Sequence, residues 1–390
     1  EGQSPSAPGL EPWKPYCRNL AKAMEGNAVD LLVDGREAFP AMLEAIADAK
    51  SFVSLETYIF QPDTIGRRFR DALARAAARG VQIRVIYDSV GSYDAGGEFW
   101  RPLTDEGAEL LEFHPLTRWR LRWAYTLYRR NHRKLLVVDG RVGFTGGMNI
   151  REGNLLELEP KHAIQDVHAR LEGPVVAHLQ QAFTEDWHFT TGQELLGERF
   201  FPALDELGSV TARGLPDGPD EDFEVLRMTM LGALSIAKSH VQIVTPYFVP
   251  GDSLITALNV AAMRGVAVHI VLPECGNLAL VQWACMGTVG QVLEHGCRIW
   301  LSPPPFDHTK LMVVDGNWTL LGSANWDMRT LRLNFEFNVE CYDETRAREA
   351  KEQVDQRIAR SRRLTLEEIR ARSLPVRLRD GAARLLSPYL

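Results

Sequence analysis

One sequence phrase occurs twice in this chain, once in each half. Residues 132–149 read HRKLLVVDGRVGFTGGMN and residues 308–325 read HTKLMVVDGNWTLLGSAN. Both copies keep the order H-x-K-x4-D-x6-G, then Gly or Ser, then Asn at the last position. A chain of 390 residues is long enough for about two domains. We therefore expect two related domains, one copy in each, packed as a pseudo-two-fold dimer.

The segments that precede the two phrases repeat as well. AKSFVSLETYIFQP at 49–62 corresponds to AKSHVQIVTPYFVP at 237–250, and each contains an apolar run typical of a buried strand. Strands and helices that alternate in this way predict an α/β (α+β) layered fold. The elements expected in the first half are strands at 31–36, 51–60 and 81–87 and helices at 38–50 and 64–79, the last of which corresponds to a helix at 254–264.

Composition shifts suggest where the domains begin and end. The stretch between the halves is rich in Gly, Pro and acidic residues, and the chain beyond Tyr342 becomes charged and helical in composition. We expect the following division: 1–25 as a lead-in, 26–191 as the first domain, 192–221 as a linker, 222–345 as the second domain and 346–390 as a C-terminal helical appendix.

Charge and cysteine content argue against several classes of protein. The net charge is −7, so the chain lacks the global positive field that marks many nucleic-acid binders. The five cysteines are scattered and form no CxxC, which argues against a disulfide framework or a cysteine zinc site. No apolar run approaches the ~18 residues needed to span a bilayer. Because the chain begins at Glu1 and not at Met, we expect that an upstream signal or anchor was removed.

The repeated phrase contains the groups needed to handle a phosphate ester. Side chains two positions apart in an extended segment project to the same face, so the His and the Lys of each copy should point together. If the halves pack face to face, two imidazoles and two ammonium groups meet in one pocket. Two cations suit an anionic phosphate, and two histidines suit a nucleophile and a general acid. The catalytic candidates are His132 and Lys134 in the first copy and His308 and Lys310 in the second.

The other polar positions of the phrase are expected to support this chemistry. Asn149 and Asn325 follow a tight Gly-containing turn and are expected to donate to the same oxyanion. Asp139 and Asp315 complete the motif and belong to the candidate catalytic set. Each precedes Gly at the end of an expected strand, where an Asp forms turns, so an architectural role is favoured over a chemical one.

A metal site is not predicted. His162, Asp166 and His168 lie close in sequence, but their spacing does not match a familiar zinc signature. We therefore expect neither a metal nor another cofactor.

The doubled phrase resembles the phospholipase D superfamily, and the resemblance runs from about residue 31 to about residue 342. Softer signals make the chain similar to the bacterial cardiolipin synthases: LETYIF at 55–60, QDVHARLEGPVV at 165–176, TPYFVP at 245–250 and the terminal LSPYL. The resemblance implies two tandem phospholipase D-like domains. Each would be a mixed sheet flanked by helices, with the site at their junction.

The resemblance also implies a mechanism. One His attacks phosphorus and displaces an alcohol, which leaves a phosphohistidine, and the opposite His acts as acid and then as base. Two acids are implied to hydrogen-bond and orient the His rings. Asp166 follows His132 in the first half, and Glu336 follows His308 in the second.

One position differs between the two copies. Gly147 in the first copy stands where Ser323 stands in the second, so the hydroxyl donor is present in one half only. In similar enzymes the first His is usually the nucleophile, which favours His132 here.

A basic and aromatic segment, RWRLRWAYTLYRR at 118–130, precedes the first phrase. Trp and Tyr favour the headgroup region and Arg attracts anionic lipid, so this segment is a candidate membrane contact. An ordinary half-buried helix and a nucleic-acid contact remain the alternatives. The binding candidates are Trp119, Trp123, Arg129 and Arg130.

The leading functional hypothesis is a phosphatidyltransferase that makes cardiolipin from phosphatidylglycerol and releases glycerol. The alternatives are a phospholipase D that forms phosphatidic acid, a nuclease, which the net charge argues against, and an idle membrane scaffold, which the intact phrases argue against. We expect a membrane-surface protein of the bacterial inner membrane, peripheral or anchored by the removed segment. The residues expected to line the pocket and select the acceptor are Glu56, Tyr58, Tyr247 and Phe248.

Overall fold

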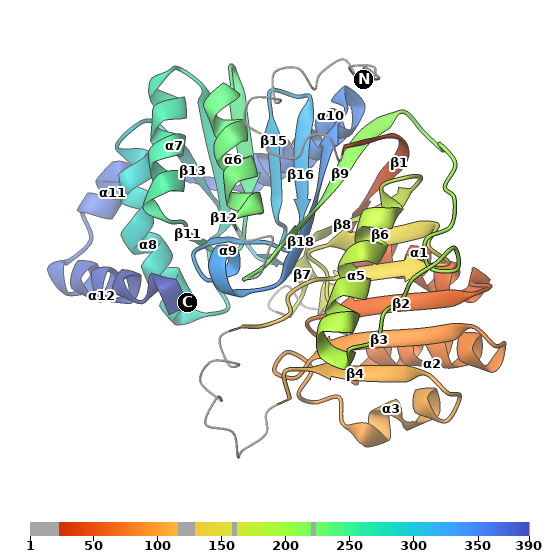
Figure 1. The fold of residues 1–390 in the computed structure, drawn as a ribbon. Coiled ribbons are helices and arrows are strands. Elements are labelled where there is room, and N and C mark those ends of the chain that lie inside the picture. Colours follow the sequence, from red (N-terminus) through yellow and green to blue (C-terminus); the bar gives the residue numbers. More distant parts are fainter. Residues whose placement is uncertain (1–22, 116–128, 158–161, 220–223, 390) are drawn as a thin grey trace.

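A mixed sheet of fifteen strands forms the centre of the protein. The computed structural model describes residues 23–115, 129–157, 162–219 and 224–389 (Figure 1). The strand order is β19-β13-β12-β10-β15-β16-β18-β9-β1-β8-β6-β5-β2-β3-β4. Seven strands on each side of the β1–β9 contact follow the same order, with β19 as an extra edge strand. The expected pseudo-two-fold arrangement is therefore confirmed.

The first half matches most of the predicted elements. The strands expected at 51–60 and 81–87 are β2 and β3, and the helix expected at 64–79 is α2. The elements of the first half are β1 (Met24–Val33), α1 (Asp34–Asp48), β2 (Phe52–Thr57), α2 (Thr64–Ala78), β3 (Gln82–Asp88), α3 (Gly97–Thr104), β4 (Glu109–Phe113), β5 (Leu135–Val138), β6 (Val142–Gly146), η2 (Glu152–Asn154), β7 (Ile164–Gln165), β8 (Val167–Glu172) and α5 (Val176–Thr191).

The second half repeats this plan with different loops. Its bounds are β9 (Val210–Asp217), α6 (Val225–Ile236), β10 (His240–Val244), β11 (Phe248–Val249), α7 (Asp252–Met263), β12 (Ala267–Pro273), α8 (Ala279–Leu293), β13 (Arg298–Ser302), β14 (Phe306–Asp307), β15 (Leu311–Val314), β16 (Trp318–Gly322), β17 (Trp326–Asp327), α9 (Thr330–Leu333), β18 (Glu336–Tyr342), α10 (Glu344–Arg360), β19 (Arg362–Leu364), α11 (Leu366–Arg370), α12 (Leu374–Leu385) and η3 (Ser387–Tyr389).

Two segments that the sequence suggested were outside the domains belong to the sheet. The stretch 192–221 contains β9, which lies between β18 and β1 at the centre of the sheet. The Gly, Pro and acidic residues around β9 disguised it as a linker. The stretch 346–390 contains β19, which pairs with β13. Residues 346–390 are otherwise mainly helical, as expected, with most of α10 and all of α11 and α12 in this range. The strand expected at 31–36 also ends early, because Asp34 adopts a left-handed φ of 59° where α1 begins.

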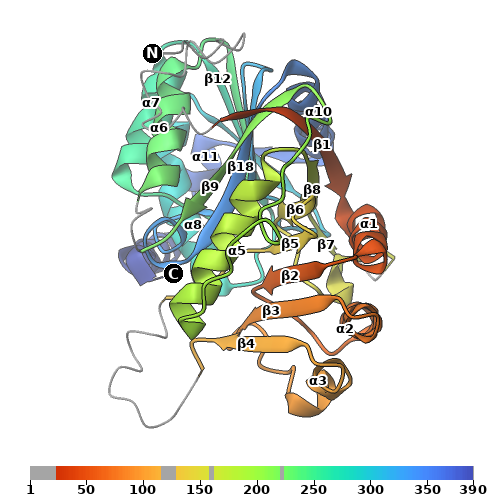
Figure 2. The same cartoon turned by 45° about the vertical axis from the view of Figure 1, so that its right-hand side comes forward.

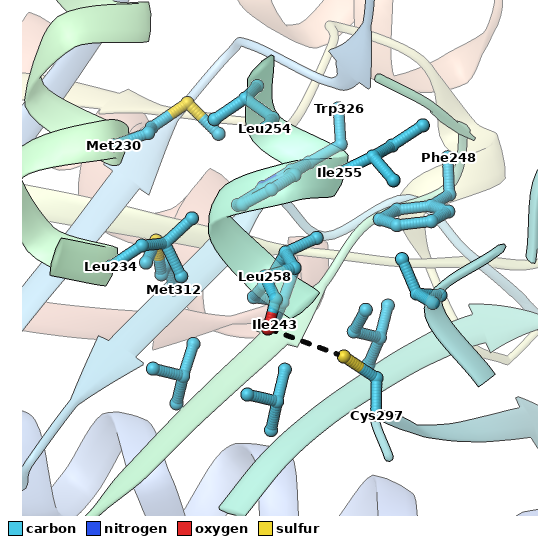
Figure 3. Close-up of a cluster of buried hydrophobic side chains, with 14 of the residues drawn as sticks. Met230, Leu234, Ile243, Phe248, Leu254, Ile255, Leu258, Cys297, Met312 and Trp326 are labelled. Carbon is cyan, nitrogen blue, oxygen red and sulfur yellow. Dashed lines mark hydrogen bonds between the residues drawn. The ribbon is translucent and has the colours of Figure 1, made fainter. Parts of the chain in front are cut away.

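Helices cover both faces of the sheet. On one face of the second half, α6, α7 and α8 pack over a core that includes Met230, Leu258 and Trp326 (Figure 3). On the other face, α5 and α10 pack over a core cluster to which both halves contribute, for example Val137 and Val313. Figure 2 shows α5 and α10 crossing the sheet near the β1–β9 contact. This shared core holds the two halves in a fixed relation, which a site built between them requires.

The described residues include no helix that is both long enough and apolar enough to cross a bilayer.

Candidate active site

The two histidines lie at the junction because each leaves its own half and contacts the other. The backbone N–H of His132 donates to the carbonyl of Phe335 at 2.9 Å, beside a parallel bridge between Asn131 and Phe335. The N–H of His308 donates to the carbonyl of Gln165 at 2.8 Å, where β14 runs parallel to β7. Because Glu336 follows Phe335 and Asp166 follows Gln165, each histidine lies next to an acid of the opposite half.

The histidine–acid pairs consequently cross between the halves. His132 Nδ1 lies 3.0 Å from a carboxylate oxygen of Glu336, and His308 Nδ1 lies 2.9 Å from Asp166 Oδ2. The sequence order had grouped Asp166 with His132 and Glu336 with His308, and that grouping is wrong. A carboxylate at Nδ1 holds the proton there and leaves Nε2 for the substrate.

Both motif lysines are buried directly behind the histidines. Lys134 Nζ donates to the carbonyl of His132 at 2.6 Å, and Lys310 Nζ donates to the carbonyl of His308 at 2.5 Å. Burial lowers the pKa of Lys134 to about 7 and that of Lys310 to about 8. An anionic substrate opposes this shift, because it stabilises the charged ammonium groups.

The imidazoles are held neutral. Burial is the largest cause that lowers the pKa of both His132 and His308 well below the usual value, and the charges of Lys134 and Lys310 lower it further. A neutral imidazole whose Nδ1 carries the proton has its lone pair on Nε2. That is the form required of a nucleophile or a general base.

The two acids have different surroundings. Glu336 accepts the hydroxyl of Ser323 and the amide of Asn334, the latter at 3.2 Å. Asp166 accepts the backbone N–H of Val167 at 2.8 Å and has no hydroxyl donor, because Gly147 stands where the other half has serine. A Cβ at Gly147 would lie 2.3 Å from the Asp166 carboxylate, so a serine there would displace the acid.

Burial raises the pKa of both acids, but to different extents. The pKa of Asp166 rises to about 8 and that of Glu336 to about 7. Hydrogen bonds from Ser323 and Asn334 oppose the rise at Glu336, because they stabilise its charged form. The Asp166–His308 pair therefore keeps its extra proton to a higher pH than the Glu336–His132 pair.

A pocket between the halves contains both histidines. Asn149 and Asn325 line it, as the sequence suggested. Asn149 Oδ1 accepts the N–H of Ile59 at 3.2 Å, and Asn325 Nδ2 donates to Thr330 Oγ1 at 3.3 Å. Their donation to an oxyanion remains a prediction. Other pocket residues include Tyr58, Arg130, Arg151, Tyr247, Asp327 and Arg329.

Sequence reasoning missed Arg151, Asp327 and Arg329. The sequence signal was available, because Arg151 and Asp327 each lie two residues beyond the Asn that ends a repeated phrase. The sequence gives no indication of the loop geometry that turns these side chains toward the pocket.

Several predicted binding residues have other roles. Arg130 is buried and pairs with Asp88 at 3.0 Å, so it is not a membrane contact, although it lines the pocket. The carbonyl of Arg129 lies 2.9 Å from His114 Nδ1, and its membrane role remains a prediction. Trp119 and Trp123 lie outside the described residues.

Two of the four residues expected to select the acceptor lie elsewhere. Tyr58 and Tyr247 line the pocket. Glu56 is buried against Asn131, and Phe248 belongs to the second-half core (Figure 3).

The motif aspartates hydrogen-bond the backbone of a neighbouring strand, and neither lines the pocket that contains the histidines. Asp139 accepts backbone N–H groups from Lys50, Ser51 and Phe52 at 2.7–2.9 Å, which fixes the start of β2 at the strand end remote from the pocket. Asp315 does the same for residues 238–240 in the second half. Both have a left-handed φ, near 50°, as expected of a turn residue. The architectural interpretation of these two positions therefore accounts for their contacts.

Asp139→Ala should destabilise the fold and spare the chemistry. Loss of three backbone hydrogen bonds to a carboxylate should cost about 3 kcal/mol and lower Tm by roughly 4 °C in a chain of 390 residues. Thermal unfolding followed by circular dichroism measures the shift, with the exposed Asp105→Ala as control. A kcat reduced a hundredfold in fully folded protein would contradict this assignment.

Among the described residues, no group of three His, Cys, Asp or Glu side chains is placed to hold a metal ion.

Comparisons with known proteins show the family to which the chain belongs. A family model described as "Cardiolipin synthase, PLD-like domain" matches residues 42–187 and 230–359. The chain belongs to this family. It is thus a phospholipase D-type phosphatidyltransferase, and the resemblance seen in the sequence is confirmed.

Individual relatives support the same assignment. The chain is 36% identical over 377 residues to the major cardiolipin synthase ClsA of Bacillus subtilis, covering 95% of this chain and 77% of the relative. It is 33% identical to a cardiolipin synthase of Listeria monocytogenes, covering 94% of this chain and 76% of that protein. The fold resembles that of phosphatidylserine synthase from Haemophilus influenzae, with a TM-score of 0.71, 15% identity and coverage of 97% of this chain and 100% of that chain.

Proposed function

We propose that this enzyme makes cardiolipin from two molecules of phosphatidylglycerol at a membrane surface. The observation that carries the proposal is the crossed pair of His–carboxylate units in one pocket, with a buried lysine behind each histidine. The names of the relatives supply the substrate class, since they are described as cardiolipin synthases.

In the first step, Nε2 of one histidine attacks the phosphorus of phosphatidylglycerol. A P–N bond forms, the bond between phosphorus and the glycerol oxygen breaks, and the opposite histidine protonates the departing oxygen. Lys134 and Lys310 neutralise charge that builds up on the phosphoryl oxygens. The products are glycerol and a phosphatidyl-histidine.

In the second step, the glycerol hydroxyl of another phosphatidylglycerol attacks the same phosphorus. The opposite histidine, now neutral, removes the hydroxyl proton, and the P–N bond breaks. The energy of the original phosphodiester is retained in the covalent intermediate, so the transfer requires no nucleotide.

We assign His132 as the nucleophile and His308 as the acid and base. Glu336 is stabilised as a carboxylate by Ser323 and Asn334, and this negative charge favours the positive charge that His132 gains on bonding to phosphorus. The Asp166–His308 pair keeps an extra proton to about pH 8, which makes it the better proton donor.

Product analysis tests the proposal. The protein is incubated with phosphatidylglycerol vesicles, and the lipids are separated and identified. We expect cardiolipin and an equal amount of glycerol, both absent with His132→Ala. Phosphatidic acid as the main product would instead show that water is the acceptor, and cleavage of plasmid DNA without lipid turnover would show a nuclease.

Ser323→Ala should shift the pH profile of kcat/KM. In the wild-type enzyme we expect a bell-shaped dependence of kcat/KM on pH. The value rises as Glu336 ionises near pH 7 and falls as the Asp166–His308 pair loses its proton near pH 8. Without the hydroxyl, the charged form of Glu336 is less stable and its pKa rises. The acidic limb should therefore move up by about one pH unit, because a hydrogen bond to a charged group contributes about 1.5–3 kcal/mol.

The measurement is kcat/KM between pH 5.5 and 9, with Ser323→Thr as the variant that keeps the hydroxyl. An unmoved acidic limb together with a uniformly lower rate would show that Ser323 has only a structural role.

A further inference from the structure

Two arginines line the pocket in addition to Arg130. Arg151 and Arg329 line it from opposite halves, and neither guanidinium has an ion pair or hydrogen bond with any described residue. The Nε atom of Arg329 is buried without a hydrogen-bond partner. Arg130, the other arginine of this pocket, is in contrast paired with Asp88. Asp63 acts on Arg151, and Asp327 acts on Arg329, only through longer-range charge, so both guanidinium groups keep donors that an anionic ligand can engage.

Each of these arginines is close enough to the histidine of the opposite half to influence its protonation. Burial chiefly, and the charge of Arg151 in addition, lowers the pKa of His308. Burial, and the charge of Arg329 in addition, likewise lowers the pKa of His132. Arg151 therefore lies on the His308 side of the pocket and Arg329 on the His132 side.

The cationic groups of the site lie at two depths. In the proposed mechanism, the reacting phosphate carries one negative charge and lies beside the two buried lysines and the two asparagines of the pocket. Arg151 and Arg329 lie nearer the surface than these lysines and are half-buried. Guanidinium groups bind phosphate oxygens in a bidentate manner, so they suit a second phosphate away from the reacting phosphorus.

We propose that Arg151 binds the phosphate of the acceptor lipid, so that the enzyme selects an anionic phospholipid over a neutral alcohol or water. This inference rests on the proposed function. The acceptor hydroxyl must reach the base His308, so the rest of the acceptor lies on the His308 side, where Arg151 is. In phosphatidylglycerol, the phosphate is separated from that hydroxyl only by the glycerol carbons. Arg329 lies on the side of the nucleophile and hence contacts the donor.

The test separates the acceptor from the donor. The donor is a phosphatidyl p-nitrophenol, whose release reports formation of the covalent intermediate, and the acceptor is either phosphatidylglycerol or glycerol. For Arg151→Gln, we expect the ratio of transfer to phosphatidylglycerol over transfer to glycerol to fall by ~10–100-fold, through a higher KM for phosphatidylglycerol. Arg151→Lys keeps the charge and should recover part of the ratio.

Arg329→Gln is the matched control. It should slow p-nitrophenol release and lower transfer to both acceptors by the same factor. An unchanged acceptor ratio in Arg151→Gln, or a selective loss in Arg329→Gln, overturns the proposal. Failure of the wild-type enzyme to form cardiolipin from phosphatidylglycerol, with or without the phosphatidyl p-nitrophenol donor, would instead refute the proposed function.

Discussion

His308→Ala should react once with an activated donor and then stop. Transfer from phosphatidylglycerol should fall by ~10⁴-fold or more, because the departing glycerol oxygen no longer receives a proton. A p-nitrophenolate group leaves without that proton, so the first step should survive with a phosphatidyl p-nitrophenol. The second step still needs a base to activate the acceptor. The phosphatidyl-His132 intermediate should therefore accumulate.

A burst of p-nitrophenol equal to the enzyme concentration measures the first step, and mass spectrometry of the digested protein locates the phosphatidyl group. His132→Ala should give neither a burst nor a labelled peptide. Label on His308 in the wild-type enzyme, or a burst from His132→Ala, would reverse the roles assigned to the two histidines.

Glu336→Gln should impair the first step even though Glu336 belongs to the half that does not contain the nucleophile. Its side chain hydrogen-bonds Nδ1 of His132, from which it is 204 residues distant in sequence. An amide keeps the shape but removes the charge that stabilises the phosphorylated imidazole. By analogy with other His–carboxylate pairs, kcat should fall by ~10³–10⁴-fold.

The same assay with Asp166→Asn tests whether the pairs are crossed. With the activated donor, Glu336→Gln should slow the burst itself, whereas Asp166→Asn should keep the burst and slow the turnover that follows. Pairing within each half would give the opposite pattern. Glu340→Gln, a buried acid on the same strand that pairs with Arg213, controls for loss of stability.

Much of the fold followed from local patterns. The buried strands β2 and β3 and the helix α2 were predicted from apolar runs and helix-forming composition, which are properties of short stretches. β9 was missed because its role depends on what lies beside it. Its residues are buried between β18 and β1, and Gly214 lies where a Cβ would contact Phe337 at 2.7 Å. No local pattern reports such neighbours.

The candidate site was predicted in the same uneven way. The repeated phrase identified both histidines, both lysines and the two asparagines that line the pocket. The phrase also contains Asp139 and Asp315, whose hydrogen bonds are made at the strand end remote from the pocket. The shared spacing of His and Asp reflects one strand of fixed length, and the Asp at the end of that strand fixes the start of the neighbouring strand.

The sequence by itself determined which chemical groups the enzyme has: two histidines, two lysines and two acids, in two related halves. Only the tertiary structure decided how they combine. A hydrogen bond acts over about 3 Å, and Asp166 and His308 are 142 residues apart in the chain. Their contact exists because β14 pairs with β7 across the junction, and the equivalent bridge brings Glu336 to His132. Each half therefore supplies the acid that the other half's histidine needs.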